Sequence, residues 1–398
     1  MTDHLDGAPL DLEPEDPDDV QDLDADDAPE PPDPDLSDHR GLGWLLSFRV
    51  SARDALFASA VLLIILLVAL VAYLVLSLGA STSIVQRGGP AVARIQPLLT
   101  IDGPGTGKSP RLSRPMGVAF GPDGRIYVTD TGNNRVCVFG ADGKFQLEFG
   151  SFGVAKPLPG AKDTWKPGRM NYPIGIDVDS NGTVYIADFR NDQVQAYTSG
   201  GKFLRSFPDP RKVTGRGSSG QDGTGIAVTD VAVRDGKVYA TDTFQIFVFD
   251  TEGKLLSQFG KPGAGPGDLD HPNGVAVDGR GRVYVSDSNH ARVLAFDPDR
   301  RLKWAVGNIP AGMNDTTSSP LALPRGLAVA DDGSIYVADA FSFEIVQISA
   351  EGLIVQRFGE RGVDPGQMNF PNDVDVSGDR LLIADKENNR VEVVRLVR

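Results

Sequence analysis

Short apolar stretches separated by Gly- and Asp-containing turns recur six times in the last three quarters of the chain. Each unit has an apolar stretch, a turn such as GPDG or DSNG, and a second apolar stretch of the type IYVAD. A third stretch ends in an aromatic or aliphatic residue, and most units add a fourth. Stretches this short, bounded by turn residues, favour strands over helices. The pattern predicts an all-β domain of repeated, mostly four-stranded units, which open at Pro115, Pro173, Val228, Pro272, Pro324 and Pro371.

The second strand of each unit ends in an aspartate, and these aspartates mark the repeat period. They lie 45 to 58 residues apart, at Asp130, Asp188, Asp242, Asp287, Asp339 and Asp385. Units of this length with about four short strands are typical of propeller blades. Six units therefore predict six blades. A carboxylate at a strand end can accept backbone N–H groups of the following loop, so we expect a structural role for these side chains rather than ligand binding.

The sixth unit has only three strands before Arg398. An apolar segment precedes the first unit, from Ala93 to Ile101, and leads into a glycine-rich stretch as the fourth strands of other units do. We expect this segment to pair antiparallel with Val391–Val397 and so to complete the last blade without an open edge.

The repeats resemble the NHL-repeat family of six-bladed β-propellers over residues 93–398. The segments that resemble the family pattern most strongly are DTGNNRV at 130–136 and ADKENNRV at 384–391. The resemblance implies a binding platform for proteins, carbohydrates or nucleic acid, and it favours the membrane-anchored bacterial type, because propellers of this kind form the exported sensor of some bacterial receptor kinases.

The first 92 residues have a different character. Residues 1–39 hold 16 acidic and no basic side chains, which accounts for most of the net charge of -15. Such a composition predicts a disordered acidic tail, either a solubilising segment or one that binds a basic partner. Residues 40–54 form a juxtamembrane segment with Trp44 and Phe48, and residues 79–92 form a linker to the propeller.

Residues 55–78 lack charge and are centred on VLLIILLVALVAYLVL. As a helix they would span about 36 Å, which exceeds the hydrocarbon layer of roughly 30 Å. The long segment before them favours a retained single-pass anchor over a cleaved signal. Arg40, Arg49 and Arg53 on one flank, against Arg87 and Arg94 on the other, predict a cytoplasmic N-terminus and an exported propeller at the cell membrane.

The few cysteines and histidines limit the possible chemistry. One cysteine, Cys137, excludes a disulfide framework within the chain. Amidating lyases, which share this type of propeller, need several histidines on a metal, as the resemblance implies, but the predicted propeller has only His271 and His290. A mixed histidine and carboxylate site stays open. We predict no cofactor and no metal, and we name no catalytic residue.

The loops after the second strands and those before each opening proline should share one face of the disc, because both connect strand ends of the same sense. Donor-rich groups suited to carboxylates, phosphates or sugar hydroxyls fall in these loops, at Asn134, Arg135, Arg190, His290, Arg292, Asn389 and Arg390. Aromatic residues depart from the repeat pattern at Phe244, Phe341 and Phe343, and Trp165 lies among lysines in a long insertion. Exposed aromatics favour a protein or glycan partner, whereas rings tucked between blades would be structural.

These features predict a membrane-anchored NHL-repeat propeller that acts as a binding or scaffold module for a protein or glycan at the cell surface. Nucleic acid is not expected, because the last 308 residues carry a net charge of only -2. The main alternative is a propeller enzyme, a metal-dependent lyase or lactone hydrolase with its site at the central channel. A third possibility is an assembly factor beside a larger envelope complex.

Overall fold

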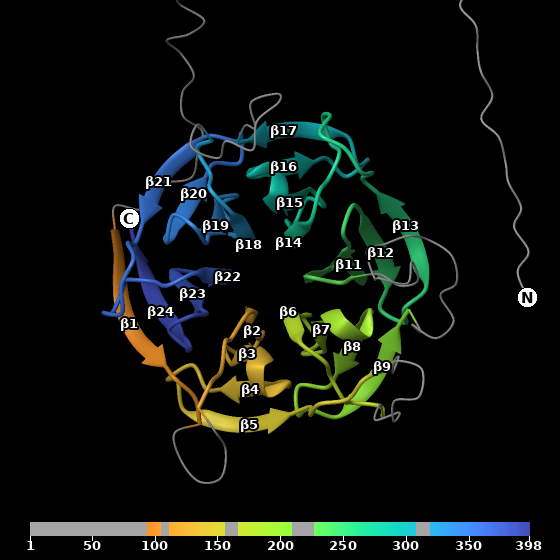
Figure 1. Cartoon of the computed structure of the whole chain (residues 1–398), viewed down its shortest axis with the longest axis vertical. Helices are drawn as coiled ribbons and strands as arrows, with labels where there is room; N and C mark the ends of the chain where they lie inside the picture. Colours follow the sequence, from red (N-terminus) through yellow and green to blue (C-terminus); the bar gives the residue numbers. More distant parts are fainter. Residues whose placement is uncertain (1–93, 105–110, 156–165, 209–226, 308–318) are drawn as a thin grey trace, which may run out of the picture. The chain divides into compact units, whose positions relative to one another are not determined.

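The computed structural model describes residues 94–104, 111–155, 166–208, 227–307 and 319–398, and they form a ring of six four-stranded antiparallel sheets (Figure 1). The first three blades are β2 (Val118–Phe120), β3 (Ile126–Asp130), β4 (Arg135–Phe139) and β5 (Phe145–Phe149); β6 (Pro173–Val178), β7 (Val184–Asp188), β8 (Gln193–Tyr197) and β9 (Phe203–Phe207); and β10 (Val231–Arg234), β11 (Lys237–Thr241), β12 (Ile246–Asp250) and β13 (Leu255–Phe259). The six-bladed, all-β prediction is therefore confirmed.

The other three blades follow the same order from the axis to the rim. They are β14 (Pro272–Val277), β15 (Val283–Asp287), β16 (Arg292–Phe296) and β17 (Leu302–Val306); β18 (Pro324–Val329), β19 (Ile335–Asp339), β20 (Glu344–Ile348) and β21 (Ile354–Phe358); and β22 (Pro371–Ser377), β23 (Arg380–Asp385), β24 (Arg390–Val397) and β1 (Arg94–Ile101). Single turns of 3-10 helix follow three of the second strands, as η1 (Thr131–Asn133), η2 (Phe189–Asn191) and η3 (Ser288–His290).

The ring closes within blade six. Strand β1 pairs antiparallel with β24, in a register that runs from Arg94 opposite Val397 to Ile101 opposite Val391. The N-terminal strand thus forms the outer edge of a blade whose three inner strands come from the C-terminal end (Figure 1). The predicted pairing and its direction are both confirmed.

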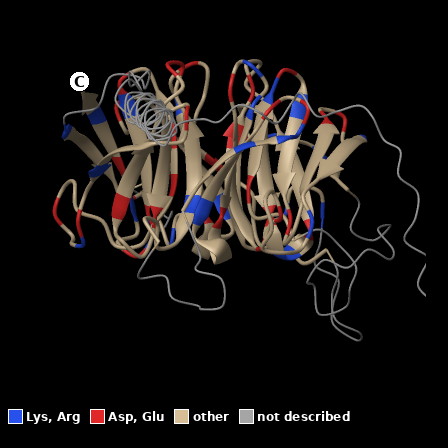
Figure 2. Ribbon diagram, turned by 90° about the horizontal axis from the view of Figure 1, so that it is seen from above, with Lys and Arg blue, Asp and Glu red and all other residues tan. Residues whose placement is uncertain are grey.

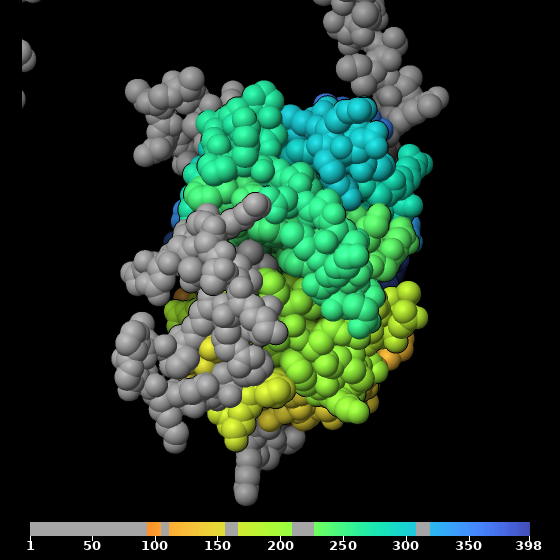
Figure 3. All heavy atoms as spheres, turned by 90° about the vertical axis from the view of Figure 1, so that its right-hand side faces the viewer, coloured from red at the N-terminus to blue at the C-terminus, as the bar shows by residue number. Residues whose placement is uncertain are grey.

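Apolar side chains between neighbouring blades form the core, in six clusters around the ring. The tyrosine of the IYVAD-type strand is fully buried in four blades, at Tyr127, Tyr185, Tyr284 and Tyr336. On the side that carries β9, β13 and β17, the rim is a continuous surface where the described atoms are in view (Figure 3). Blade-to-blade packing, rather than any central core, holds the ring.

The innermost strands approach one another most closely near their beginnings. A Cβ on Gly175 would lie 2.6 Å from the Cα of Asp230 in the next blade, and a Cβ on Gly274 would lie 2.9 Å from the Cα of Gly326. Real Cβ atoms do not make such contacts, so these positions need glycine for close backbone approach rather than for a turn. The channel is consequently narrow at this end of the strands.

The predictions for the tail, the juxtamembrane segment, the membrane helix and the linker all fall on residues 1–93, outside the described residues. Within the described ranges no helix is long and apolar enough to cross a membrane. The span at 55–78 therefore stays a prediction.

Candidate functional site

Two faces of the ring differ in what they contain. One face, here called the loop face, carries the loops after the second strands and the segments before each blade's opening residue. These two sets of loops are hydrogen-bonded together, for example from His271 N to Thr243 O over 2.7 Å and from Arg190 N to Asn171 O over 3.1 Å. The opposite face, here called the turn face, carries the hairpins between first and second strands. Acidic and basic residues are interspersed at the end that holds the C-terminus, which is the turn face (Figure 2).

The strand-end aspartates hold the loop face together. Each accepts a backbone N–H from the segment that opens its own blade, as in Ser113 N to Asp130 over 2.7 Å and Asn369 N to Asp385 over 2.7 Å. The other four do the same at Asp188, Asp242, Asp287 and Asp339. Their role is structural, as the sequence predicted, but the bonded backbone lies in the preceding segment rather than in the following loop.

Three of the candidate arginines belong to this same network. The Nε atoms of Arg135, Arg292 and Arg390 donate to Asp130, Asp287 and Asp385 over 2.7 to 2.8 Å. Arg390 also donates to three backbone carbonyls between residues 363 and 367. These guanidinium groups are largely buried, and the bonds they make are internal ones that fix the loops.

Asn134 and Asn389 adopt left-handed backbone conformations at the end of the loop, with φ of 54° and 55°. Their side-chain oxygens accept the backbone N–H of Tyr172 and Arg114, both over 2.8 Å. Asparagine tolerates this conformation better than most residues, and its amide then links two segments. His290 is likewise paired, through Nδ1, with Asp287 at 2.7 Å.

The aromatic candidates and Arg190 are the more accessible part of the predicted surface. Phe341 is 59% exposed and packs edge-on against Phe370, with ring centroids 5.6 Å apart. The guanidinium of Arg190 lies 4.5 Å from the ring centroid of Tyr172. Phe244 contacts His271, and Phe343 lies under Arg361, both as partly buried rings. Trp165 lies outside the described residues. Of the candidates that the structure describes, the three arginines bonded to strand-end aspartates belong to the scaffold, and Phe341 is open surface.

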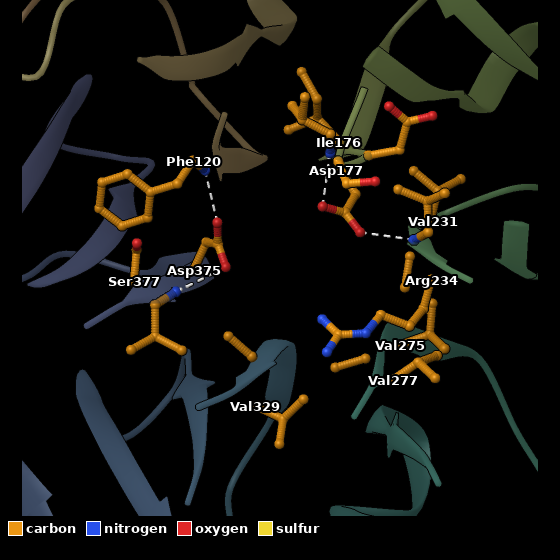
Figure 4. Close-up of a pocket in the computed structure, with 18 of the residues that line it drawn as sticks. Phe120, Ile176, Asp177, Val231, Arg234, Val275, Val277, Val329, Asp375 and Ser377 are labelled. Carbon is orange, nitrogen blue, oxygen red and sulfur yellow. Dashed lines mark hydrogen bonds between the residues drawn. The ribbon is translucent and has the colours of Figure 1, made fainter. Parts of the chain in front are cut away.

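A cavity of about 630 Å³ occupies the channel and opens on the turn face, opposite the predicted surface. Its walls are the six innermost strands and their hairpins, with Phe120, Ile176, Val231, Val277 and Val329 among the apolar lining (Figure 4). None of the sequence-predicted site residues lines it.

Seven aspartates line this cavity, and four of them, Asp177, Asp230, Asp373 and Asp375, bond to the backbone of neighbouring blades. Asp373 accepts Val118 N at 3.0 Å and Asp375 accepts Phe120 N at 2.6 Å, both in the next blade. Asp177 accepts Val233 N at 2.7 Å, and Asp230 accepts Val275 N at 2.9 Å, again one blade further on. The acceptors satisfy edge N–H groups of innermost strands, which have no further strand to pair with.

Burial raises the pKa of these carboxyl groups. Burial is the largest cause in each case, and the pKa rises to about 8 for Asp177, about 7 for Asp230 and about 6 for Asp375. The pKa of Asp373 also lies well above its ordinary value, because of burial and then of the nearby charge of Asp230. Such perturbed groups in a cavity are what functional sites commonly contain.

Arg325 lies at the narrow, loop-face end of the channel. Its Nε donates to Asn372 in the next blade over 3.2 Å. Burial lowers the pKa of this guanidinium, while Tyr172, Asp373 and Asp230 oppose the shift through their charges. These three groups come from blades two, six and three, so the guanidinium of Arg325 lies within electrostatic reach of several blades at the loop-face end of the channel.

The channel aspartates were missed at the sequence level, although the repeats contain the signal. In blade one the opening strand has Gly117 and Ala119, whereas the matching positions hold Asp230 in blade three and Asp177 in blade two. Blade six has aspartate at both positions, as Asp373 and Asp375. A polar residue where the other repeats have glycine or alanine, on a strand that lines the axis, indicates a channel group.

In the part of the chain that the structure describes, no three His, Cys, Asp or Glu side chains converge so as to hold a metal ion. His271 pairs with Asp270 through Nδ1, and both histidines lie on the loop face, away from the channel aspartates.

The closed ring of four-stranded blades defines a six-bladed β-propeller. The NHL repeat model matches residues 112–139 and 170–197, and a model described as a 6-bladed beta-propeller matches residues 223–303. The membrane-anchored type is a separate prediction that these matches do not address.

Similar proteins include protein brain tumor from Drosophila melanogaster, 26% identical over 168 residues, which are 41% of this chain and 14% of that protein. NHL repeat-containing protein 3 from Homo sapiens is 28% identical over 199 residues, 44% of this chain and 50% of that protein. The chain thus spans half or less of these relatives' length.

Among solved structures, a structural genomics protein of unknown function from Bacteroides thetaiotaomicron has a TM-score of 0.53 and 18% identity, over 74% of this chain and 73% of that one. A streptogramin B lyase structure has a TM-score of 0.50 and 13% identity, over 77% of this chain and 100% of that one. At such identities the likeness shows the fold alone.

Proposed function

We propose that this protein is a binding module that recognises a protein partner through the loop face of its propeller. The observation that carries the proposal is an exposed apolar group on a fixed backbone. Phe341 is 59% exposed, and Val363, also in a loop-face segment, is 70% exposed. Aromatic side chains are enriched in protein–protein interfaces relative to the rest of the surface.

The backbone beneath these side chains is held by the aspartate network. Asp339 accepts N–H groups of Ala322 and Leu323, and Ala340 N donates to Leu323 O over 3.0 Å. Phe341 follows directly, so its ring is presented from a short loop tied on both sides. A pre-organised platform loses little conformational entropy on binding, which favours recognition over a role in packing.

A photo-crosslinking amino acid at position 341 tests the proposal in the full chain in cells. The matched control is position 255, because Leu255 is also exposed, at 47%, but lies on the rim strand β13. We expect a discrete crosslinked protein adduct from position 341 and none from position 255. Equal adducts from both, or an adduct only from turn-face positions such as 235, would overturn the proposal.

The same experiment distinguishes a glycan partner from a protein partner. Stacked aromatic and arginine groups such as Tyr172 and Arg190 can bind sugar rings as well as protein. A glycan would give no protein adduct at 341, and binding to an array of glycans would be lost in Arg190→Ala.

The enzyme alternative rests on the channel rather than on the loop face. A cavity with carboxyl groups whose pKa values lie near neutrality offers general acids and bases. Purified full-length protein with stoichiometric metal that survives dialysis would favour a metal-dependent lyase or lactone hydrolase. A metal-free, stable protein would count against it.

The proposed location is the cell membrane, with the propeller exported and the N-terminus cytoplasmic. The uncharged residues 55–78 and the arginines that flank them support it. Protease added to intact cells, or to spheroplasts where an outer membrane is present, should digest the propeller and spare the tail. The reverse protection pattern would reject this orientation.

A further inference from the structure

The four channel aspartates form two levels along the axis. Asp230 and Asp373 hold the same position in blades three and six, which face each other across a six-membered ring. Asp177 and Asp375 hold the position two residues further on, in blades two and six. Because a strand rises roughly 3.3 Å per residue, the two levels are about 6.6 Å apart.

The inner level, formed by Asp230 and Asp373, contains buried carboxyl groups that form no direct ion pair within the described ranges. Asp230 and Asp373 are only 6% and 7% exposed, yet no arginine, lysine or histidine of the described ranges forms an ion pair with either. Arg325 lowers the pKa of Asp230 through its charge but makes its one hydrogen bond to Asn372. A buried carboxylate is costly unless a cation or a proton compensates it. These two side chains therefore favour a cationic group beside them.

The walls between the two levels are apolar. Val231 and Val374 follow Asp230 and Asp373 along their strands, Val275 holds the matching position in blade four, and Ile176 precedes Asp177. A ligand that bridges the levels consequently meets charge at two depths and hydrocarbon in between. A single metal ion is too small to contact both charged levels across this apolar stretch. In addition, no three acidic or histidine side chains of the described residues converge on one point.

The cavity has a single open end among the described residues. Its lining includes hairpin residues of the turn face, such as Pro122, Asn181 and Ser377, and no loop-face residue. At the other end the close glycine contacts and Arg325 narrow the channel. A ligand of modest width would enter from the turn face and stop at the inner aspartates.

We propose that this cavity binds a linear aliphatic diammonium ligand, one ammonium group at Asp230 and Asp373 and the other near Asp177 and Asp375. The ligand class is a short diamine or the end of a polyamine. The two ammonium groups replace the missing counter-ions, and the methylene chain packs against the valines. The site lies on the face opposite the proposed protein-binding surface, so either proposal can fail without the other.

Substitution of Arg234 should change the affinity for a cationic ligand in the opposite direction from substitution of the channel aspartates. It lines the mouth of the cavity, and Figure 4 shows its guanidinium directed into it. Nothing in the described part of the chain forms an ion pair or hydrogen bond with that guanidinium. A cation at the mouth opposes the entry and binding of another cation. Asp179, Asp235 and Asp331 at the same mouth act in the other direction.

The test is calorimetric titration of the full-length protein in detergent with putrescine. We expect one site per chain, with n-butylamine at least about tenfold weaker because it engages one level only. Asp177→Asn and Asp373→Asn should each weaken putrescine by about tenfold or more, since asparagine keeps an acceptor and loses the charge. Asp142→Asn, an exposed carboxylate on an outer turn of blade one, is the matched control and should change nothing.

The release of protons from the channel carboxyl groups on ligand binding gives an independent test of the site. Carboxyl groups with raised pKa values carry protons in the free protein, and binding of an ammonium group releases them. The affinity should therefore rise between about pH 6 and pH 8.5, and the apparent enthalpy should depend on the buffer in the sense of proton release.

Several results would overturn the proposal: no binding of putrescine, equal affinities for putrescine and n-butylamine, or tighter binding of Mg²⁺ or Ca²⁺ than of putrescine. Arg234→Ala should bind putrescine about two- to fivefold more tightly. Arg234 is an exposed residue at the end of β10, so this variant decides the matter even where an aspartate variant fails to fold. An unchanged or weaker affinity in Arg234→Ala would contradict a cation site.

Discussion

Asp373 in blade six accepts the backbone N–H of Val118 in blade one over 3.0 Å, although 255 residues separate the two. The bond lies at the innermost edge of the ring, while the β1–β24 pairing joins the same two ends of the chain at the rim. The last blade is therefore tied to the first at the axis as well as at the circumference. A channel carboxylate has a structural function in addition to any ligand it receives.

The first prediction concerns the strand-end aspartates. Asp287→Ala should lower the free energy of unfolding by about 3 to 5 kcal/mol, because it removes the acceptor of Asp270 N and leaves the largely buried side chains of Arg292 and His290 without their carboxylate partner. Asp287→Asn should cost less, since it keeps one acceptor. Denaturant unfolding measures both, and Asp299→Ala, an exposed carboxylate, is the control. Equal losses in Asp287→Ala and Asp299→Ala would contradict the structural role.

The closure of the ring gives the second prediction. Deletion of Arg94–Ile101 should leave a markedly destabilised or aggregating propeller, because it exposes the edge of β24 and uncovers the cluster around Ile101. The point variant Ile101→Ala should cost about 2 to 4 kcal/mol. Leu98→Ala is the matched control, since Leu98 lies in the same strand but is partly exposed. A thermal unfolding midpoint unchanged by the Ile101 substitution would mean that β1 does not close the ring.

Cys137 provides the third prediction, which tests the core directly. The thiol is fully buried, and burial raises its pKa to about 12. Because the thiolate is the reactive form, an aromatic disulfide reagent should not modify the native protein at neutral pH. Modification should appear only with unfolding, at the rate of global or local opening. Stoichiometric reaction within minutes under native conditions would show that blade one is open between β4 and its neighbours.

The sequence was sufficient for the blade count and the closure because both depend on local patterns. Turn residues, alternating apolar strands and the strand-end aspartates repeat in every blade, and the missing fourth strand could be found by counting. Burial of the loop-face arginines was less evident from the sequence. Arg135 follows two asparagines in a polar loop, yet its guanidinium turns back onto Asp130 and becomes internal.

The channel could not be read from one repeat at a time. Asp230 and Asp373 belong to repeats far apart in the sequence, and only the closed ring shows that blades three and six face each other. Likewise, Arg325 looks like an ordinary strand-opening residue until the structure brings it near Asp373 and Asp230. Which aromatic rings stay exposed also depends on packing between blades, as the difference between Phe341 and Phe244 illustrates.

The last prediction is a decline in stability with rising pH that the channel aspartates cause. Their pKa values are raised in the folded state, to about 8 for Asp177, about 7 for Asp230 and about 6 for Asp375, above the ordinary value near 3.8. The native state therefore binds more protons than the unfolded state between about pH 4 and pH 8. Linkage then requires that the free energy of unfolding falls as the pH rises through this window.

Asp177→Asn removes the group with the highest of these three pKa values while keeping an acceptor for Val233 N. We expect the variant to be more stable than the parent at pH 8, and its stability to decline less steeply between pH 5.5 and pH 8.5. Carboxyl groups with lowered pKa values, such as Asp123 and Asp278, act in the opposite sense but only as the pH falls below about 4. Urea unfolding of both proteins across the range measures the slopes. A parent whose stability rises from pH 5.5 to pH 8.5, or a variant with the parent's slope, would show that these carboxyl groups are ionised in the native channel.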